Sequence, residues 1–126
     1  MADIQCGKFE IRSVGADGLT RWSARLTAVP DPIWQKAFSE EAAVSRVLGI
    51  YLGHNLTLTA DIIEVSLLEN SEQAVVGAIR NVIAKANSTS ARYAAELQRQ
   101  TDAEEQRRAT AAAQMQRVRD KYPDGI

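Results

Sequence analysis

The chain has 126 residues, of which 45% are hydrophobic and 25% are charged, a composition typical of one soluble globular domain. Its 15 basic and 16 acidic residues leave a formal net charge of -1. A protein that binds nucleic acid through many phosphate contacts needs a concentrated excess of Lys and Arg. The charge balance therefore argues against nucleic acid as a partner.

The N-terminal sequence MADIQCGKFEIRS has no charged start followed by a long apolar run, so it does not resemble a secretory signal. No stretch approaches the ~18 consecutive apolar residues of a membrane span. We therefore expect a cytoplasmic protein with no membrane contact. Cys6 is the single cysteine, so it cannot form an internal disulfide, and we interpret it as a structural residue.

Residues 8–29 predict an antiparallel hairpin. The segments KFEIRSV and LTRWSARLTAV flank the sequence GADG, and apolar side chains alternate with polar ones in each segment. Period-two alternation around a Gly/Asp turn is typical of two paired strands.

Residues 22–38, WSARLTAVPDPIWQKAF, contain both tryptophans and two of the three prolines. Asp31 can accept a hydrogen bond from the first turn of a helix, and Pro32 suits the first helical position. Trp34 and Phe38 then lie one turn apart on the same side. We expect a corner between a strand and a helix, with these aromatic rings in the core.

Residues 43–52 fit either a helix or a strand. Helical spacing is shown by four apolar residues, Val44, Val47, Leu48 and Tyr51. Two glycines, the β-branched residues and the alternating sequence NLTLT favour strands instead. We favour strands at 46–52 and 55–67, joined by the turn LGHN. The second strand is expected to break near Ala60 and Asp61.

The sequence ENSEQAVVGAIRNVIAKAN predicts a helix, with Asn70 as its cap, Gln73 returning the capping bond and an apolar stripe facing the sheet. The sequence NSTS at 87–90 favours the end of a helix, so we expect a break or kink there. Beyond it, 91–122 is rich in Ala, Glu, Gln and Arg and predicts a long helix, supported by Glu104 and Arg108 four residues apart.

These elements predict the α+β class. A small two-layer domain, 1–87, would have an antiparallel sheet of four strands and the order β-β-α-β-β-α. A long, charged, alanine-rich C-terminal helix, 88–126, would follow it.

No catalytic or metal-binding motif is present. His54 is the only histidine, and the chain has no nucleophile elbow, P-loop or dinucleotide fingerprint, so we expect no enzyme activity, metal or cofactor. A catalytic alternative would use His54 with Asp61 or Glu64, but a histidine base needs an orienting partner that the sequence does not indicate.

The main functional hypothesis is based on the length of the C-terminal helix. It is longer than a small sheet needs, so we expect a non-catalytic assembly module that self-associates or binds a protein partner through this helix. A 3.5-residue repeat places the interface at one seam, which is apolar at both ends and polar in the middle. The expected interface residues are Leu97, Ala111, Met115 and Val118.

An alternative hypothesis is that the protein binds a small anionic ligand, such as a nucleotide, at a subunit interface. Trp22 or Trp34 would stack on the base. Arginine guanidinium groups would pair with phosphate, and the candidates are Arg92, Arg107 and Arg108.

Overall fold

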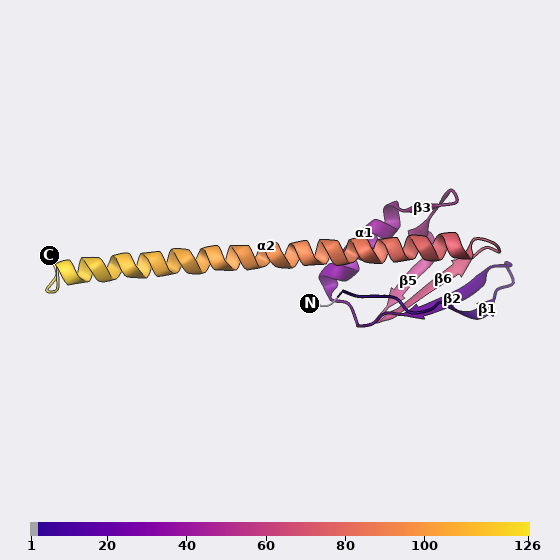
Figure 1. Cartoon of the computed structure of the whole chain (residues 1–126), viewed down its shortest axis with the longest axis horizontal. Coiled ribbons are helices and arrows are strands. Elements are labelled where there is room, and N and C mark those ends of the chain that lie inside the picture. Colours follow the sequence, from indigo (N-terminus) through magenta and orange to yellow (C-terminus); the bar gives the residue numbers. More distant parts are fainter. Residues whose placement is uncertain (1–2) are drawn as a thin grey trace. The chain divides into compact units, whose positions relative to one another are not determined.

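A four-stranded antiparallel sheet and two α-helices make up most of the computed structural model, which describes residues 3–126 (Figure 1). The strands follow the order β1-β2-β6-β5, and this architecture confirms the predicted α+β class. The chain divides into two compact units after Ala91. The bounds of the sheet strands and α-helices are β1 (Glu10–Val14), β2 (Thr20–Arg25), α1 (Pro32–Val44), β5 (Leu56–Thr59), β6 (Ile62–Leu67) and α2 (Glu72–Lys121).

The predicted hairpin is formed by β1 and β2. Its turn is closed by the amide of Gly15, which donates to the carbonyl of Leu19 at 2.8 Å. Gly18 has a φ of 81°, a left-handed conformation that glycine adopts without a steric penalty. The register shifts between Ile11 and Ser13, so β1 contains a local irregularity of the bulge type.

The corner before α1 has the predicted cap. The side chain of Asp31 accepts a hydrogen bond from the amide of Trp34 at 2.8 Å, and Pro32 occupies the first turn, where its missing N–H leaves no partner unsatisfied. The rings of Trp34 and Phe38 are stacked, with centroids 5.2 Å apart and an interplanar angle of 11°. Both side chains are buried in the core.

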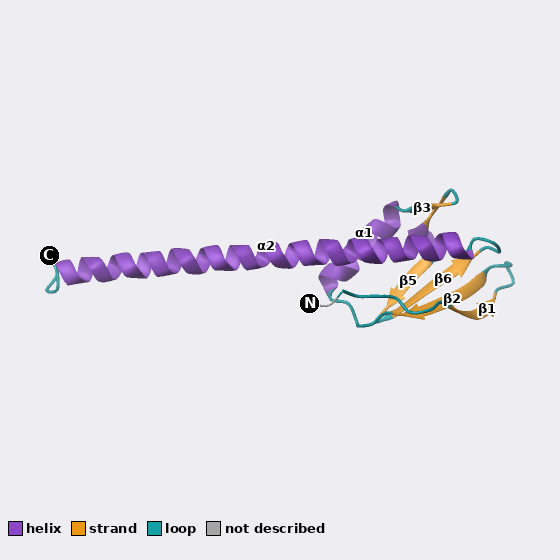
Figure 2. Cartoon of the chain, in the orientation of Figure 1, coloured by secondary structure: helices purple, strands orange, loops and turns teal. Residues whose placement is uncertain are grey.

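The interpretation of 46–52 as a strand of the main sheet was wrong. This segment forms a separate two-stranded hairpin of β3 (Arg46–Val47) and β4 (Ile50–Tyr51), as Figure 2 shows for β3. The turn residues Leu48 and Gly49 have φ values of 52° and 82°, the conformation that tight two-residue hairpins require. The expected turn at LGHN is present as a 3₁₀ turn, η1 (Leu52–His54).

The fourth strand of the sheet comes instead from the predicted break at Ala60 and Asp61. Ala60 has a φ of 54°, and the chain reverses there so that β5 pairs with β6 in an antiparallel hairpin. The expected long strand at 55–67 is therefore two strands.

The start of α2 differs from the predicted cap. The carbonyl of Ser71, and not that of Asn70, accepts the first helical bond, from the amide of Val75 at 3.0 Å. Asn70 has a φ of 69°, and its backbone N–H donates a hydrogen bond to the carboxylate of Glu72 at 3.3 Å. Gln73 is not the residue that returns a bond. The turn before the helix has thus moved the cap by one residue.

No break interrupts α2 at 87–90, so the predicted kink was wrong: the helix is continuous from Glu72 to Lys121. Asn and Ser disfavour helices because their side chains compete for nearby backbone groups. Here the side chain of Asn87 bonds instead to Ile4 and Trp34, outside its own helix. The remaining propensity cost of such residues is below about 0.7 kcal/mol each, too small to end a long helix.

The core of the first unit lies between one face of the sheet and the helical segments α1 and 72–91. Alternate residues of β6 face this core, and the opposite face is mainly polar, with Glu64 between Ser23 and Thr57 of the neighbouring strands, as expected for an antiparallel sheet covered on one side. An ion pair between Lys85 and Glu41, at 3.6 Å, joins the two helical segments. The buried core residues include Leu26, Trp34, Phe38, Ile63, Val65, Leu67, Ile79, Val82, Ile83 and Ala86.

Candidate functional site

Trp34 is a core residue and does not present a face for stacking a ligand base. Its side chain is 2% exposed, one ring face lies against Phe38, and its indole N–H donates to the side-chain oxygen of Asn87 at 2.8 Å. The structural interpretation of this corner is confirmed. The ligand-stacking role predicted for Trp34 is inconsistent with its burial, because a base would have to displace core packing.

Trp22 is half-buried at the margin of the same core. Its indole N–H donates to the hydroxyl of Thr20 at 2.8 Å, two residues earlier on β2. The ring is therefore positioned by its own strand. Its stacking role stays a prediction.

The three arginines of the ligand hypothesis lie in the second unit and are exposed, whereas both tryptophans belong to the first unit. Arg108 contacts Glu104 at 3.5 Å, so the predicted i,i+4 pair is confirmed. Arg92 and Arg107 are 15 positions apart, which corresponds to about 22 Å along one helix. A single phosphate group therefore cannot bind both arginines of one chain.

Sequence reasoning missed the role of Asn87, which connects three segments of the first unit. Its side-chain oxygen accepts from the amide of Ile4 at 3.1 Å and from the indole of Trp34 at 2.8 Å. Its side-chain nitrogen donates to the carbonyl of Ile4 at 2.8 Å. These bonds fasten the N-terminal segment and α1 to α2. No local pattern indicates this role, because the partners are 83 and 53 positions away in the sequence.

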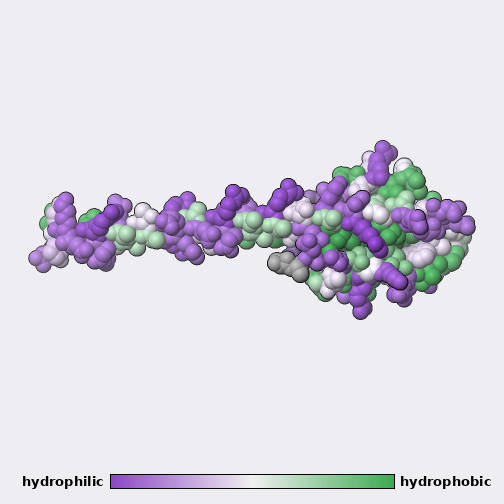
Figure 3. Space-filling model, in the orientation of Figure 1, coloured by the Kyte–Doolittle hydropathy of each residue, from purple (hydrophilic) through white to green (hydrophobic). Residues whose placement is uncertain are grey.

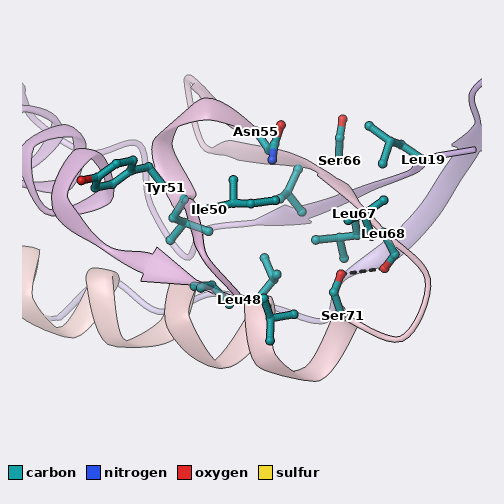
Figure 4. A pocket seen from close by; sticks show the side chains of 13 residues that line it. Leu19, Leu48, Ile50, Tyr51, Asn55, Ser66, Leu67, Leu68 and Ser71 are labelled. Atoms are coloured by element: carbon teal, nitrogen blue, oxygen red, sulfur yellow. Dashed lines mark hydrogen bonds between the residues drawn. The ribbon is translucent and has the colours of Figure 1, made fainter. Parts of the chain in front are cut away.

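An apolar pocket lies beside the β3–β4 hairpin (Figure 4). The hairpin, the end of β6 and the start of α2 supply its walls, and the hydroxyl of Ser71 donates to the carbonyl of Leu68 at 2.6 Å at its margin. Its volume is about 80 Å³, below the roughly 300 to 1,000 Å³ of pockets for drug-sized ligands. It can hold one small apolar side chain, and a nucleotide does not fit.

A larger and more open hollow, of about 380 Å³, lies between α1 and β5 and includes His54. The residues proposed to assist His54 are not assembled around it. Asp61 lies 3.6 Å from the guanidinium of Arg25, and Glu64 lies on the polar face of the sheet among the residues of another hollow. The ring of His54 lies beside that of Tyr51, with centroids 5.8 Å apart. The structure thus offers no orienting carboxylate for His54 in the described part of the chain.

Cys6 is half-buried and lines a shallow hollow with Arg80 and Asn87. Burial raises the pKa of its thiol, and the nearby positive charge of Arg80 opposes part of this rise. A raised pKa keeps the thiol protonated and unreactive near neutral pH. Within residues 3–126, no three His, Cys, Asp or Glu side chains are grouped so that they could hold a metal ion.

We expect Cys6 in the folded chain to react with a disulfide reagent such as DTNB more slowly than in the unfolded chain. Because the pKa is raised, the folded state holds the thiol proton more tightly than the unfolded state does. The resulting contribution to the free energy of unfolding is fully present below the ordinary pKa of the thiol, and it is lost as pH rises through the pKa of the folded state. Reaction rates with and without denaturant test this, and Arg80→Gln should slow the folded reaction further. Equal rates in both states would contradict the assignment.

The second unit presents a different kind of surface. All residues from 92 to 126 are exposed, including four large apolar side chains of its helical part that are 49 to 57% exposed: Tyr93, Leu97, Met115 and Val118. Ala111 is exposed as well. The four residues predicted for an interface are therefore on the surface of the single chain.

Comparisons with models of protein families, with curated proteins and with solved structures gave no significant match to this chain. No helix within the described residues is both long enough and apolar enough to cross a lipid bilayer.

Proposed function

We propose that this protein is a non-catalytic assembly module that associates with copies of itself or with another protein through residues 92–121 of α2. The observation that carries the proposal is the exposure of large apolar side chains on this part of the helix. Leu97, Met115 and Val118 are each more than half exposed in the single chain. Burying such a side chain stabilises an interface by about 1.5–3 kcal/mol.

The spacing of these residues supports one shared surface. Leu97 and Met115 are 18 positions apart, which is five turns of an α-helix, so their side chains point in the same direction. Ala111 and Val118 lie within about 60° of this direction at 100° per residue. The ion pair of Glu104 and Arg108 lies between Leu97 and Ala111 along the helix. Figure 3 shows the resulting mixture of hydrophilic and apolar residues on the surface of this helix.

The double variant Leu97→Ala, Met115→Ala tests the proposal by thermal unfolding. Association makes the melting temperature of the parent rise with protein concentration, because binding stabilises the folded form. Losing a buried Leu or Met costs about 2–5 kcal/mol, so the variant should melt at a lower temperature and with a weaker concentration dependence.

The matched control is Gln98→Ala, Gln116→Ala. These residues have the same 18-position separation, are exposed, and each donates to an Asp four positions later at 2.9 Å. Exposed substitutions usually change stability by at most about 0.5 kcal/mol, so the control should melt like the parent. If the Leu97/Met115 variant and the control melt alike at every concentration, the proposed interface is wrong.

A further inference from the structure

In the middle of the second unit the side-chain charges change from negative to positive at a single residue, Gln106. Residues 104–108 read Glu-Glu-Gln-Arg-Arg, so two acidic residues precede Gln106 and two arginines follow it. All five are exposed on α2. Two copies of this segment aligned in parallel would place acid beside acid and arginine beside arginine. An antiparallel alignment centred on Gln106 places the acidic half of each copy beside the basic half of the other.

The apolar residues give the same centre. In an antiparallel pair centred on Gln106, positions that add up to 212 lie opposite each other, so Leu97 faces Met115 of the second copy. The same rule places Glu104 opposite Arg108, Thr101 opposite Ala111 and Ala94 opposite Val118. These are the a and d positions of the 3.5-residue repeat, and in antiparallel coiled coils each a residue is layered with a d residue.

The length of the exposed helix agrees with this register. The helical part of the second unit runs from 92 to 121, and its midpoint lies within one residue of Gln106. Pairing in this register therefore uses the whole exposed helical segment of both copies. The charge pattern, the apolar layers and the length are separate observations, and they lead to one alignment.

We propose that residues 92–121 pair with the same segment of a second copy as an antiparallel two-helix coiled coil centred on Gln106. This inference rests on the proposed function and specifies its partner and orientation. A parallel pair is disfavoured because like charges would face each other across the middle of the interface. The polar centre selects the orientation, and the apolar layers near both ends supply the attraction.

Cysteine cross-linking tests the register in the full chain, with Cys6 replaced by Ser. Thr101→Cys and Ala111→Cys are small changes at exposed positions of the single chain. With oxidised glutathione, an equal mixture of the two single variants should form a disulfide-linked dimer, because the two thiols face each other. Thr101→Cys alone should not, because its two copies would lie about 15 Å apart along the axis, beyond the reach of about 4.4–6.8 Å between Cα atoms of a disulfide.

A charge exchange provides a second readout. Glu104→Lys with Glu105→Lys, and separately Arg107→Glu with Arg108→Glu, should each weaken self-association roughly tenfold, because they place like charges together. All four changes in one chain restore opposite charges across an antiparallel pair, so association should recover. Sedimentation equilibrium measures each dissociation constant.

Two results would overturn the proposed pairing. Dimers from Thr101→Cys alone at the yield of the mixture would indicate a parallel pair, and no dimer from the mixture would exclude this register. Failure of the register is distinguishable from failure of the proposed function. In the first case the stability loss in the Leu97/Met115 variant and its concentration dependence persist, and in the second they are absent.

Discussion

Replacing Trp34 with alanine is expected to destabilise the first unit by about 3–5 kcal/mol, the usual cost of removing a buried large aromatic side chain. Trp34 is 2% exposed and stacks on Phe38, so the substitution leaves a cavity in the core. It also removes the indole donor that Asn87 accepts. The loss is a large fraction of a typical total stability of about 5–15 kcal/mol. Chemical denaturation followed by circular dichroism measures it.

Trp34→Phe and Ile11→Ala complete this experiment. The phenylalanine variant keeps an aromatic ring in the core but removes the indole N–H, so it should lie between the parent and the alanine variant in stability. Ile11 is 54% exposed on β1, and its truncation should change stability little. A Trp34→Ala variant as stable as Ile11→Ala would show that the corner is not part of the core.

Asn87→Ala is the second substitution with a large expected effect, about 2–4 kcal/mol. It removes the two hydrogen bonds that the side-chain oxygen of Asn87 accepts, from the Ile4 N–H and the Trp34 indole. It also removes the bond that the side-chain nitrogen donates to the Ile4 carbonyl. A polar group left without a partner away from water costs about 1–3 kcal/mol, and the groups bonded here are partly buried. Denaturant unfolding measures the loss of stability, and amide exchange at Ile4 should accelerate because its N–H loses its acceptor.

Asn81→Ala is the matched control, since Asn81 lies on the same helix but is exposed. The variants Asn87→Ala and Trp34→Phe remove the two sides of one hydrogen bond, so their effects should not add in the double variant. If Asn87→Ala is no more destabilising than Asn81→Ala, the three-segment connection does not contribute to stability.

Features set by nearby residues were predictable from the sequence. The β1–β2 hairpin follows from alternation around GADG, and the cap of α1 depends on Asp31, Pro32 and the amide of Trp34, all within four positions. The helical spacing of Trp34 and Phe38 places both rings on one side of α1, where they stack. For the hairpin and the cap, the interaction that fixes the structure lies inside the local segment itself.

Features set by distant residues were not predictable in this way. Residues 87–90 have the local character of a helix end, yet the helix continues, because Asn87 bonds to groups far away in the sequence. The segment 46–52 has strand propensity but not the position of a sheet strand, because β5 occupies the place beside β6. Propensity identifies a strand, and only tertiary pairing identifies its neighbour.

The candidate site shows the same division. The exposed residues Leu97, Ala111, Met115 and Val118 were found from a repeat within one helix, and their exposure on the single chain agrees with a surface role. The ligand hypothesis combined residues from separate segments. The stacking role predicted for Trp34 is inconsistent with its burial. The sequence did not indicate this, because a single rare aromatic residue has the same sequence signature in a core as in a binding site.

Sedimentation equilibrium of the full-length chain over a wide concentration range tests the central claim most directly. The monomer mass is 13.8 kDa. If residues 92–121 form a self-association surface, the fitted mass should rise with concentration to that of a dimer. The Leu97→Ala, Met115→Ala variant should remain at 13.8 kDa over the same range. A parent chain that stays at the monomer mass up to millimolar concentration, indistinguishable from the double variant, would contradict self-association through this helix.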